Sequence, residues 1–101
     1  MVEIRNYIDG KQLAAASGAW LDDHEPATGK IYARIPDSDG RDVEAAVAAA
    51  ARAYPAWSAT PADERGRWLL KLAALVERDL EKLARAECVD NGKPLDLARS
   101  L

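Results

Sequence analysis

Two kinds of periodicity divide the chain into an extended N-terminal part and a helical C-terminal part. Up to Pro36 the apolar residues come in short alternating runs, whereas beyond Asp37 they recur every three or four positions. Alternation is the period of a strand with one buried face, and the longer spacing is that of an amphipathic helix. The order of a hairpin and short strands followed by long helices predicts a mixed α/β fold.

The first extended residues predict a β-hairpin over residues 4–13. Asp9-Gly10 lies at its centre, and this dipeptide suits the positive backbone angles of a two-residue turn. Trp20 and the leucine after it offer a further short extended segment. A turn over residues 25–29 follows, because its proline and glycine favour one.

A strand with one buried face is predicted after that turn and ends at Pro36. Its apolar residues alternate with Lys30, Tyr32 and Arg34. The buried face would consist of Ile31, Ala33 and Ile35.

The helical part predicts a first helix over residues 41–54, with capping oxygens supplied by residues 37–39. Pro55 either stops this helix or bends it. Thr60 is predicted to cap a second helix, with Pro61 at the first helical position. That helix extends to about Asp90, and its length allows a break near residues 78–79.

The second helix carries an apolar stripe that we expect to be buried. Its members are Leu69, Leu72, Val76, Leu80 and Leu83. Asn91-Gly92 should end the helix as a left-handed cap. A further helix then begins at Pro94 and is cut short at Leu101, with nothing to pack on.

Composition and charge narrow the possible functions. The 101 residues suffice for one domain or part of one, and the net charge of −3 is spread over interspersed residues of both signs. We therefore expect no nucleic-acid partner. A single cysteine and the lack of a long apolar run predict a soluble protein in a reducing, cytoplasmic compartment, without a membrane partner.

Residue types that carry catalysis are sparse. Cys88 lies near a predicted helix C-terminus, where the helix dipole disfavours a thiolate, so we interpret it as structural. His24 has no neighbouring histidine or cysteine with which to bind zinc. Trp57 and Trp68 flank helix ends and are expected in the core. The glycines lie too far apart for a phosphate-binding loop, so no dinucleotide fingerprint is present.

Five motifs follow one another along nearly the whole chain. They are Asn6-Tyr7-Ile8-Asp9-Gly10 with Trp20; Pro26-Ala27-Thr28-Gly29-Lys30 with Ala33-Arg34-Ile35-Pro36; Asp42-Val43-Glu44-Ala45-Ala46-Val47; Trp57 with Thr60-Pro61 and Glu64-Arg65; and Asp90-Asn91-Gly92-Lys93-Pro94-Leu95 with Ala98-Arg99. Through them the chain resembles the N-terminal segment of the NAD(P)-dependent aldehyde dehydrogenase superfamily. Residues 86–99 are most similar to the muconic-semialdehyde branch, with betaine-aldehyde enzymes next. Glu25 departs from the pattern, since many members carry asparagine there.

The resemblance implies a parent chain of several hundred residues, with a Rossmann-like cofactor domain, a catalytic domain and an oligomerisation arm. Residues 1–101 would be a truncated N-terminal part of the cofactor-binding domain of a homo-oligomer. In such enzymes a cysteine thiolate attacks an aldehyde, hydride passes to NAD or NADP, and a glutamate activates the water that releases the acid. None of those catalytic or cofactor-binding residues maps onto this segment, which we expect to be inert alone.

One family site does map onto the chain, a monovalent-cation site. The resemblance places it on the backbone carbonyls of Asp23 and His24 and on the carboxylate of Asp90. Oxygen ligands of this kind suit hard cations. In the alternative interpretation, Asp90 only hydrogen-bonds a turn.

A second functional class remains open. The segment could be a standalone helical adaptor or oligomerisation module without redox activity. The helix that is interrupted at Leu101 favours the interpretation as part of a dehydrogenase, because it has no stop signal of its own.

Overall fold

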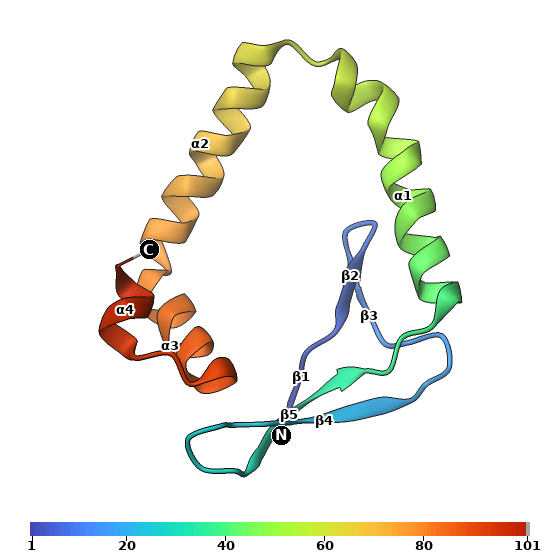
Figure 1. Cartoon of the computed structure of the whole chain (residues 1–101). Coiled ribbons are helices and arrows are strands. Elements are labelled where there is room, and N and C mark those ends of the chain that lie inside the picture. The colour runs from blue at the N-terminus through green and yellow to red at the C-terminus, as the bar shows by residue number, and fades with distance from the viewer. Residues whose placement is uncertain (101) are drawn as a thin grey trace. The chain divides into compact units, whose positions relative to one another are not determined.

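A computed structural model describes residues 1–100 (Figure 1). These residues form two compact units. The first unit comprises Met1–His24 and Ile31–Ala59, and the second comprises Glu25–Lys30 with the chain from Thr60 onward. Strands fill the beginning of the chain and helices its remainder, which confirms the mixed α/β class. The helices are α1 (Gly40–Ala59), α2 (Ala62–Arg78), α3 (Leu80–Asn91) and α4 (Leu95–Arg99).

The first unit contains a three-stranded sheet of order β1-β5-β4. Its strands are β1 (Val2–Glu3), β4 (Trp20–His24) and β5 (Ile31–Pro36). β1 is parallel to β5, with Val2 opposite Ala33, while β4 and β5 are antiparallel. Ala33 is fully buried, but Ile31 is 43% exposed, so the predicted inner face of β5 is only partly covered.

The predicted hairpin is confirmed as the pair β2 (Asn6–Ile8) and β3 (Lys11–Leu13). Asp9 and Gly10 have φ angles of 53° and 75°, as a two-residue turn with positive φ at both positions requires. The turn before β5 is also confirmed, because the Gly29 N–H donates to the Glu25 carbonyl at 2.8 Å.

Helix α1 begins at a reciprocal cap. The Asp39 carboxylate accepts the Arg41 N–H at 2.9 Å, and the Asp42 carboxylate accepts the Asp39 N–H at 3.0 Å. The helix continues through Pro55 to Ala59, so the predicted end at residue 54 is wrong. An interior proline loses one helix hydrogen bond and its ring crowds the carbonyl four residues earlier, yet here the helical geometry continues beyond it.

Helix α2 starts one residue later than predicted. Pro61 has a ψ of 145°, which is extended, and therefore occupies the cap position that the sequence assigns to Thr60. Arg65 closes this helix end. Its N–H donates to the Pro61 carbonyl at 3.0 Å and its Nε to the Thr60 carbonyl at 3.1 Å.

The predicted break in the long helix is confirmed at Asp79, which separates α2 from α3. The expected burial of the apolar stripe is wrong for this chain. Leu69 is 64% exposed and Leu72 57%, and both predicted core tryptophans, Trp57 and Trp68, are about half exposed.

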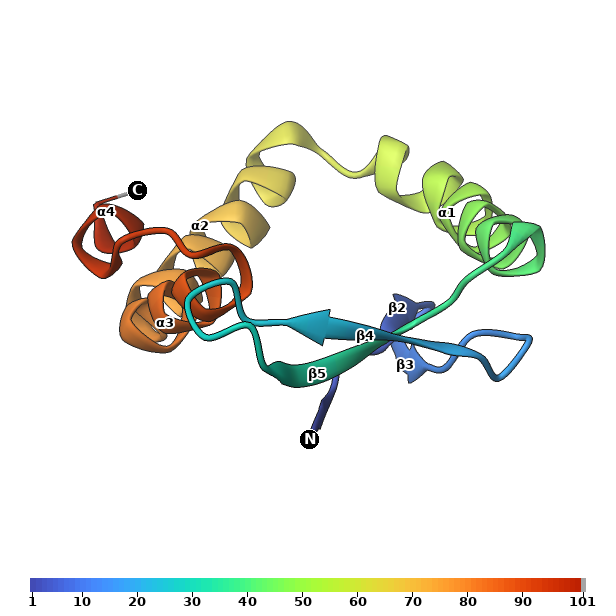
Figure 2. The ribbon, with the colours of Figure 1, turned by 60° about the horizontal axis from the view of Figure 1, so that its bottom comes forward.

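Helix α4 packs on α3, so the expectation that it has nothing to pack on is wrong (Figure 2). Ala84 of α3 and Ala98 of α4 are both buried. Arg99 donates to both carboxylate oxygens of Glu81, at 2.9 and 2.7 Å. This two-point geometry fixes the direction of α4 as well as its position.

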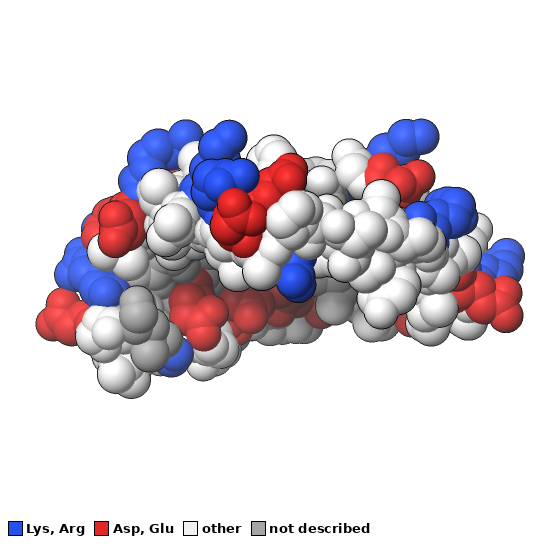
Figure 3. Space-filling model, turned by 90° about the horizontal axis from the view of Figure 1, so that it is seen from above, with Lys and Arg blue, Asp and Glu red and all other residues white. Residues whose placement is uncertain are grey.

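Charges of both signs are interspersed on the face shown in Figure 3. Among the described residues, no helix combines the length and apolarity that crossing a membrane requires. The buried side chains of residues 1–100 are small, except for Asp42: they are Ala15, Ala33, Ala84 and Ala98.

Candidate functional site

The turn between α3 and α4 is held by side chains as well as by its backbone. Gly92 has a φ of 79° and caps α3 in the left-handed conformation, as predicted, and its N–H donates to the Cys88 carbonyl at 3.0 Å. Asn91 donates from Nδ2 to Glu87 at 2.8 Å and accepts the Lys93 N–H at 2.8 Å. Lys93 Nζ lies 3.5 Å from the same Glu87 oxygen. We refer to these five residues as the junction network.

The turn over residues 25–30 lies against the junction network in the same compact unit. A Cβ atom placed on Gly92 would lie 3.5 Å from Pro26 Cβ. The turn carries its own hydrogen bonds: Thr28 Oγ1 donates to Glu25 at 3.2 Å and accepts the Lys30 N–H at 3.2 Å. Two of the motifs that carry the family resemblance are thus in contact.

The predicted cation ligands lie near the C-terminal ends of two elements, Asp23 and His24 in β4 and Asp90 in α3. Asp23 is half-buried in β4, and its Oδ2 accepts the Tyr32 hydroxyl at 3.0 Å. The strand register shifts between Asp23 and His24. Asp90 is exposed in the last turn of α3 and belongs to the second unit, whereas Asp23 and His24 belong to the first. The cation site therefore stays a prediction.

No group of three or more His, Cys, Asp or Glu side chains able to hold a metal occurs within residues 1–100. The predicted cation site would use two backbone carbonyls and only one carboxylate, so it needs no such group of side chains. His24 itself is an exposed residue at the end of β4.

Cys88 is a half-buried free thiol in the last turns of α3. Its carbonyl accepts the Gly92 N–H that closes the helix. The thiol thus lies at the C-terminal end of a helix and not at an N-terminus, where reactive cysteines are found. The structural role of Cys88 stays a prediction.

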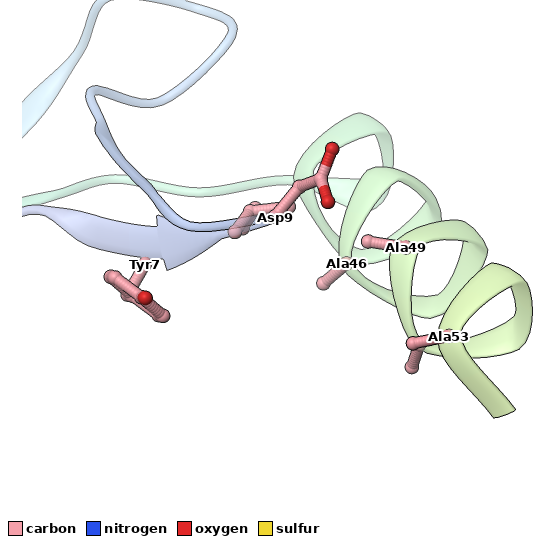
Figure 4. Close-up of a pocket in the computed structure, with 7 residues that line it drawn as sticks. Tyr7, Asp9, Ala46, Ala49 and Ala53 are labelled. Carbon is pink, nitrogen blue, oxygen red and sulfur yellow. The ribbon is translucent and has the colours of Figure 1, made fainter. Parts of the chain in front are cut away.

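A shallow groove of about 260 Å³ lies between the β2–β3 hairpin and α1 (Figure 4). Tyr7 and Asp9 line one side and the alanine face of α1 the other; those alanines are Ala46, Ala49, Ala50 and Ala53. This run lies in the middle of α1. Its spacing of i, i+3, i+4 and i+7 is the signal that could have identified one face. Asp9 also pairs with Arg52 of α1, with 3.8 Å between Asp9 Oδ2 and Arg52 Nη2.

The described residues do not fit a dinucleotide. Such a site needs neighbouring backbone N–H groups on closely spaced glycines that lead into a helix. The glycines with positive φ lie singly in separate turns; they are Gly10, Gly18, Gly29 and Gly92. The described residues therefore offer no backbone cradle for the pyrophosphate of a dinucleotide.

Comparison with known proteins identifies the relatives of this chain. Residues 13–100 match the model of the aldehyde dehydrogenase family. The chain is 44% identical over 101 residues to 2-aminomuconic semialdehyde dehydrogenase of Homo sapiens, with 100% of this chain and 20% of that protein covered.

Solved structures agree in fold as well as in sequence. PnpE from Pseudomonas sp. WBC-3 superimposes with a TM-score of 0.94 at 44% identity, over 100% of this chain and 20% of PnpE. An NAD-dependent aldehyde dehydrogenase from Sinorhizobium meliloti gives a TM-score of 0.91 at 36% identity, over 97% and 20% of the two chains. PnpE has also been solved with nicotinamide adenine dinucleotide.

The chain spans about a fifth of the length of the relatives it matches. Within that span, the match extends from the end of the hairpin to α4 and includes the junction network. The predicted resemblance is confirmed, and the chain belongs to the aldehyde dehydrogenase family.

Proposed function

We propose that this chain is the N-terminal part of the cofactor-binding domain of an enzyme that oxidises an aldehyde to a carboxylic acid with NAD or NADP. The match to the aldehyde dehydrogenase family over residues 13–100 is the observation that carries the proposal. The 44% identity to a 2-aminomuconic semialdehyde dehydrogenase supports a semialdehyde as substrate.

In this proposal the reacting groups lie outside the segment. The aldehyde is attacked by a cysteine thiolate to give a thiohemiacetal, and NAD or NADP accepts the hydride. The residues described here serve as scaffold, because Cys88 is half-buried at a helix C-terminus and no glycine-rich loop is present within residues 1–100. The 101-residue segment alone is catalytically inert.

The direct test is the absorbance of reduced cofactor formed by the full-length enzyme and by the segment, each with a muconic-type semialdehyde and with betaine aldehyde. We expect turnover by the full-length enzyme only, with a preference for the semialdehyde. Cys88→Ala in the full-length enzyme should leave kcat unchanged. Turnover by the segment that Cys88→Ala abolishes would overturn the proposal, as would a full-length enzyme that reduces neither NAD nor NADP with any aldehyde.

We also propose that the carbonyls of Asp23 and His24 and the carboxylate of Asp90 contribute to a monovalent-cation site of the full-length enzyme. The support is the family resemblance and the hard oxygen donors these residues offer. Thermal unfolding in potassium chloride and in tetramethylammonium chloride tests it. Asp90→Asn should reduce the potassium-dependent rise in Tm, whereas the control Asp63→Asn should not. An unchanged response in Asp90→Asn would exclude Asp90 as a ligand.

The remaining proposals concern location and partners. A cytoplasmic location without nucleic-acid or membrane partners is supported by the single cysteine and the interspersed charges. A homo-oligomer is supported by the family resemblance. Cell fractionation and light scattering of the full-length enzyme provide the test. Recovery in the membrane fraction, or a monomeric mass, would contradict it.

A further inference from the structure

The junction network contains a chemically labile pair, Asn91 followed by Gly92. An asparagine side chain can be attacked by the backbone nitrogen of the next residue, and glycine leaves that nitrogen unshielded because it has no side chain. Both residues are exposed, so water reaches them. None of the roles described above uses this reactivity.

The folded geometry opposes the attack in two ways. Asn91 is the last residue of α3, and a helical backbone keeps its side-chain carbon away from the Gly92 nitrogen. The Gly92 N–H is also engaged with the Cys88 carbonyl at 3.0 Å, so its proton is held within the helix end.

The side chain of Asn91 is restrained at both of its polar atoms. Nδ2 donates to Glu87 at 2.8 Å, and Oδ1 accepts the Lys93 N–H at 2.8 Å. Rotation of the side chain toward Gly92 requires both hydrogen bonds to break. Lys93 Nζ, 3.5 Å from Glu87, holds the accepting carboxylate in place.

We propose that Asn91 is a deamidation site whose reaction rate is set by local opening of the junction network. In the opened state the Gly92 nitrogen loses its proton and bonds to Asn91 Cγ, the Cγ–Nδ2 bond breaks, and ammonia leaves with that proton. Water then opens the resulting succinimide at either carbonyl, which gives aspartate or isoaspartate. No group is oxidised or reduced.

The product cannot rebuild the junction network. It lacks the Nδ2 donor to Glu87, and it places a new negative charge beside that glutamate at the C-terminal end of α3, where the helix dipole is unfavourable for an anion. Isoaspartate also lengthens the backbone inside the turn that contacts Pro26. Deamidation would therefore keep the junction open once it has occurred.

The test follows ammonia loss by peptide mapping of the full-length protein, incubated at mildly alkaline pH in buffer and in concentrated urea. Trypsin releases residues 86–99 as one peptide, because it does not cleave the Lys93–Pro94 bond. We expect deamidation at Asn91 to be at least about tenfold slower in the folded protein than in urea. Equal rates in the two conditions would overturn the proposal.

Variants then test which contacts provide the protection. Glu87→Ala removes the acceptor for Asn91 Nδ2 and should accelerate deamidation of the folded protein roughly three- to tenfold, without changing the rate in urea. Glu77→Ala, on the exposed surface of α2, is the matched control and should leave both rates unchanged. An unaltered native rate in Glu87→Ala would contradict control by the junction network. The comparison between buffer and urea needs no variant, so it decides the proposal even where Glu87→Ala does not fold.

Discussion

The carboxylate of Asp42 accepts the backbone N–H of Ala16, 26 positions earlier in the chain, at 2.9 Å. Its second oxygen accepts the Asp39 N–H at 3.0 Å, and the side chain is only 9% exposed. One buried side chain thus joins the loop between β3 and β4 to the first turn of α1. Asp42 is the one buried polar side chain among residues 1–100.

Replacement of Asp42 by alanine should lower the free energy of unfolding by about 2 kcal/mol, since two backbone donors lose their acceptor. Asp42→Asn keeps one acceptor oxygen and should cost less. Glu44→Ala, exposed on the same helix, is the control and should stay within about 0.5 kcal/mol of the native protein. Urea unfolding measures the difference, and amide exchange at Ala16 locates it. Equal midpoints for Asp42→Ala and Glu44→Ala would show that these hydrogen bonds contribute nothing.

The attachment of α4 to α3 should depend on pH. The hydrogen bonds from Arg99 hold the pKa of Glu81 below its usual range, with the nearby charge of Arg85 acting in the same direction. A lowered folded pKa means that the contact is fully present above the ordinary glutamate pKa of about 4.3 and is lost as the pH falls through the lowered value. Chemical shifts of the α4 backbone should therefore report loss of helix in acid.

Glu81→Gln should remove this acid transition, because a neutral amide at this position does not titrate. Glu64→Gln, on the exposed surface of α2, should leave the transition intact. An acid transition of α4 that persists in Glu81→Gln would assign it to another group.

Two guanidinium groups lie near the Trp20 ring at different distances, which predicts two different cation–π coupling energies. Arg34 lies 4.3 Å from the ring centroid and Arg5 lies 5.7 Å from it, while Glu3 pairs with both arginines. The cation–π contact of Arg34 should contribute about 0.5–1 kcal/mol. A double-mutant cycle of Arg34→Ala with Trp20→Leu isolates this coupling.

The same cycle with Arg5→Ala is the matched comparison, since Arg5 shares Glu3 but lies farther from the ring. We expect a smaller coupling energy there. If the coupling energy between Arg5 and Trp20 equals or exceeds that between Arg34 and Trp20, distance from the ring does not set the strength of the contact.

The exposed apolar faces of the helices predict that the 101-residue segment alone self-associates. Val43 and Val47 on α1 and Leu69 and Leu72 on α2 are each more than half exposed, and apolar surface of this extent favours association. Leu69→Gln combined with Leu72→Gln should shift the segment toward monomer in sedimentation equilibrium. Glu77→Gln should have no effect. A native segment that stays monomeric at high concentration would contradict the prediction.

Much of the local structure was predictable because it depends on neighbouring residues. The turn at Asp9-Gly10 and the left-handed cap at Gly92 follow from the backbone angles those residues favour. The helix break at Asp79 was expected only from the length of the helical segment. The extension of α1 through Pro55 was not, because proline permits either a stop or a continued helix. The family resemblance came from the order of motifs and needed no geometry.

The candidate site was likewise predictable only in its local features. The sequence indicated the junction at Asn91-Gly92 and argued against Cys88 as a nucleophile, yet it did not reveal that Glu87 and Lys93 restrain Asn91. It also marked Leu69 and Leu72 for burial by their spacing alone. Periodicity shows that a helix has an apolar face, but not whether another element covers that face.

By itself, the sequence determined the family, the order of strands and helices, and the turns at Asp9-Gly10 and Asn91-Gly92, because each depends on short-range backbone preferences or on motif order. Only the tertiary structure decided that Asp42 anchors Ala16, that Arg99 fastens α4 to Glu81, and that Pro26 lies against Gly92. These contacts join residues far apart in the chain, and their formation depends on which surfaces meet when the strands and helices pack.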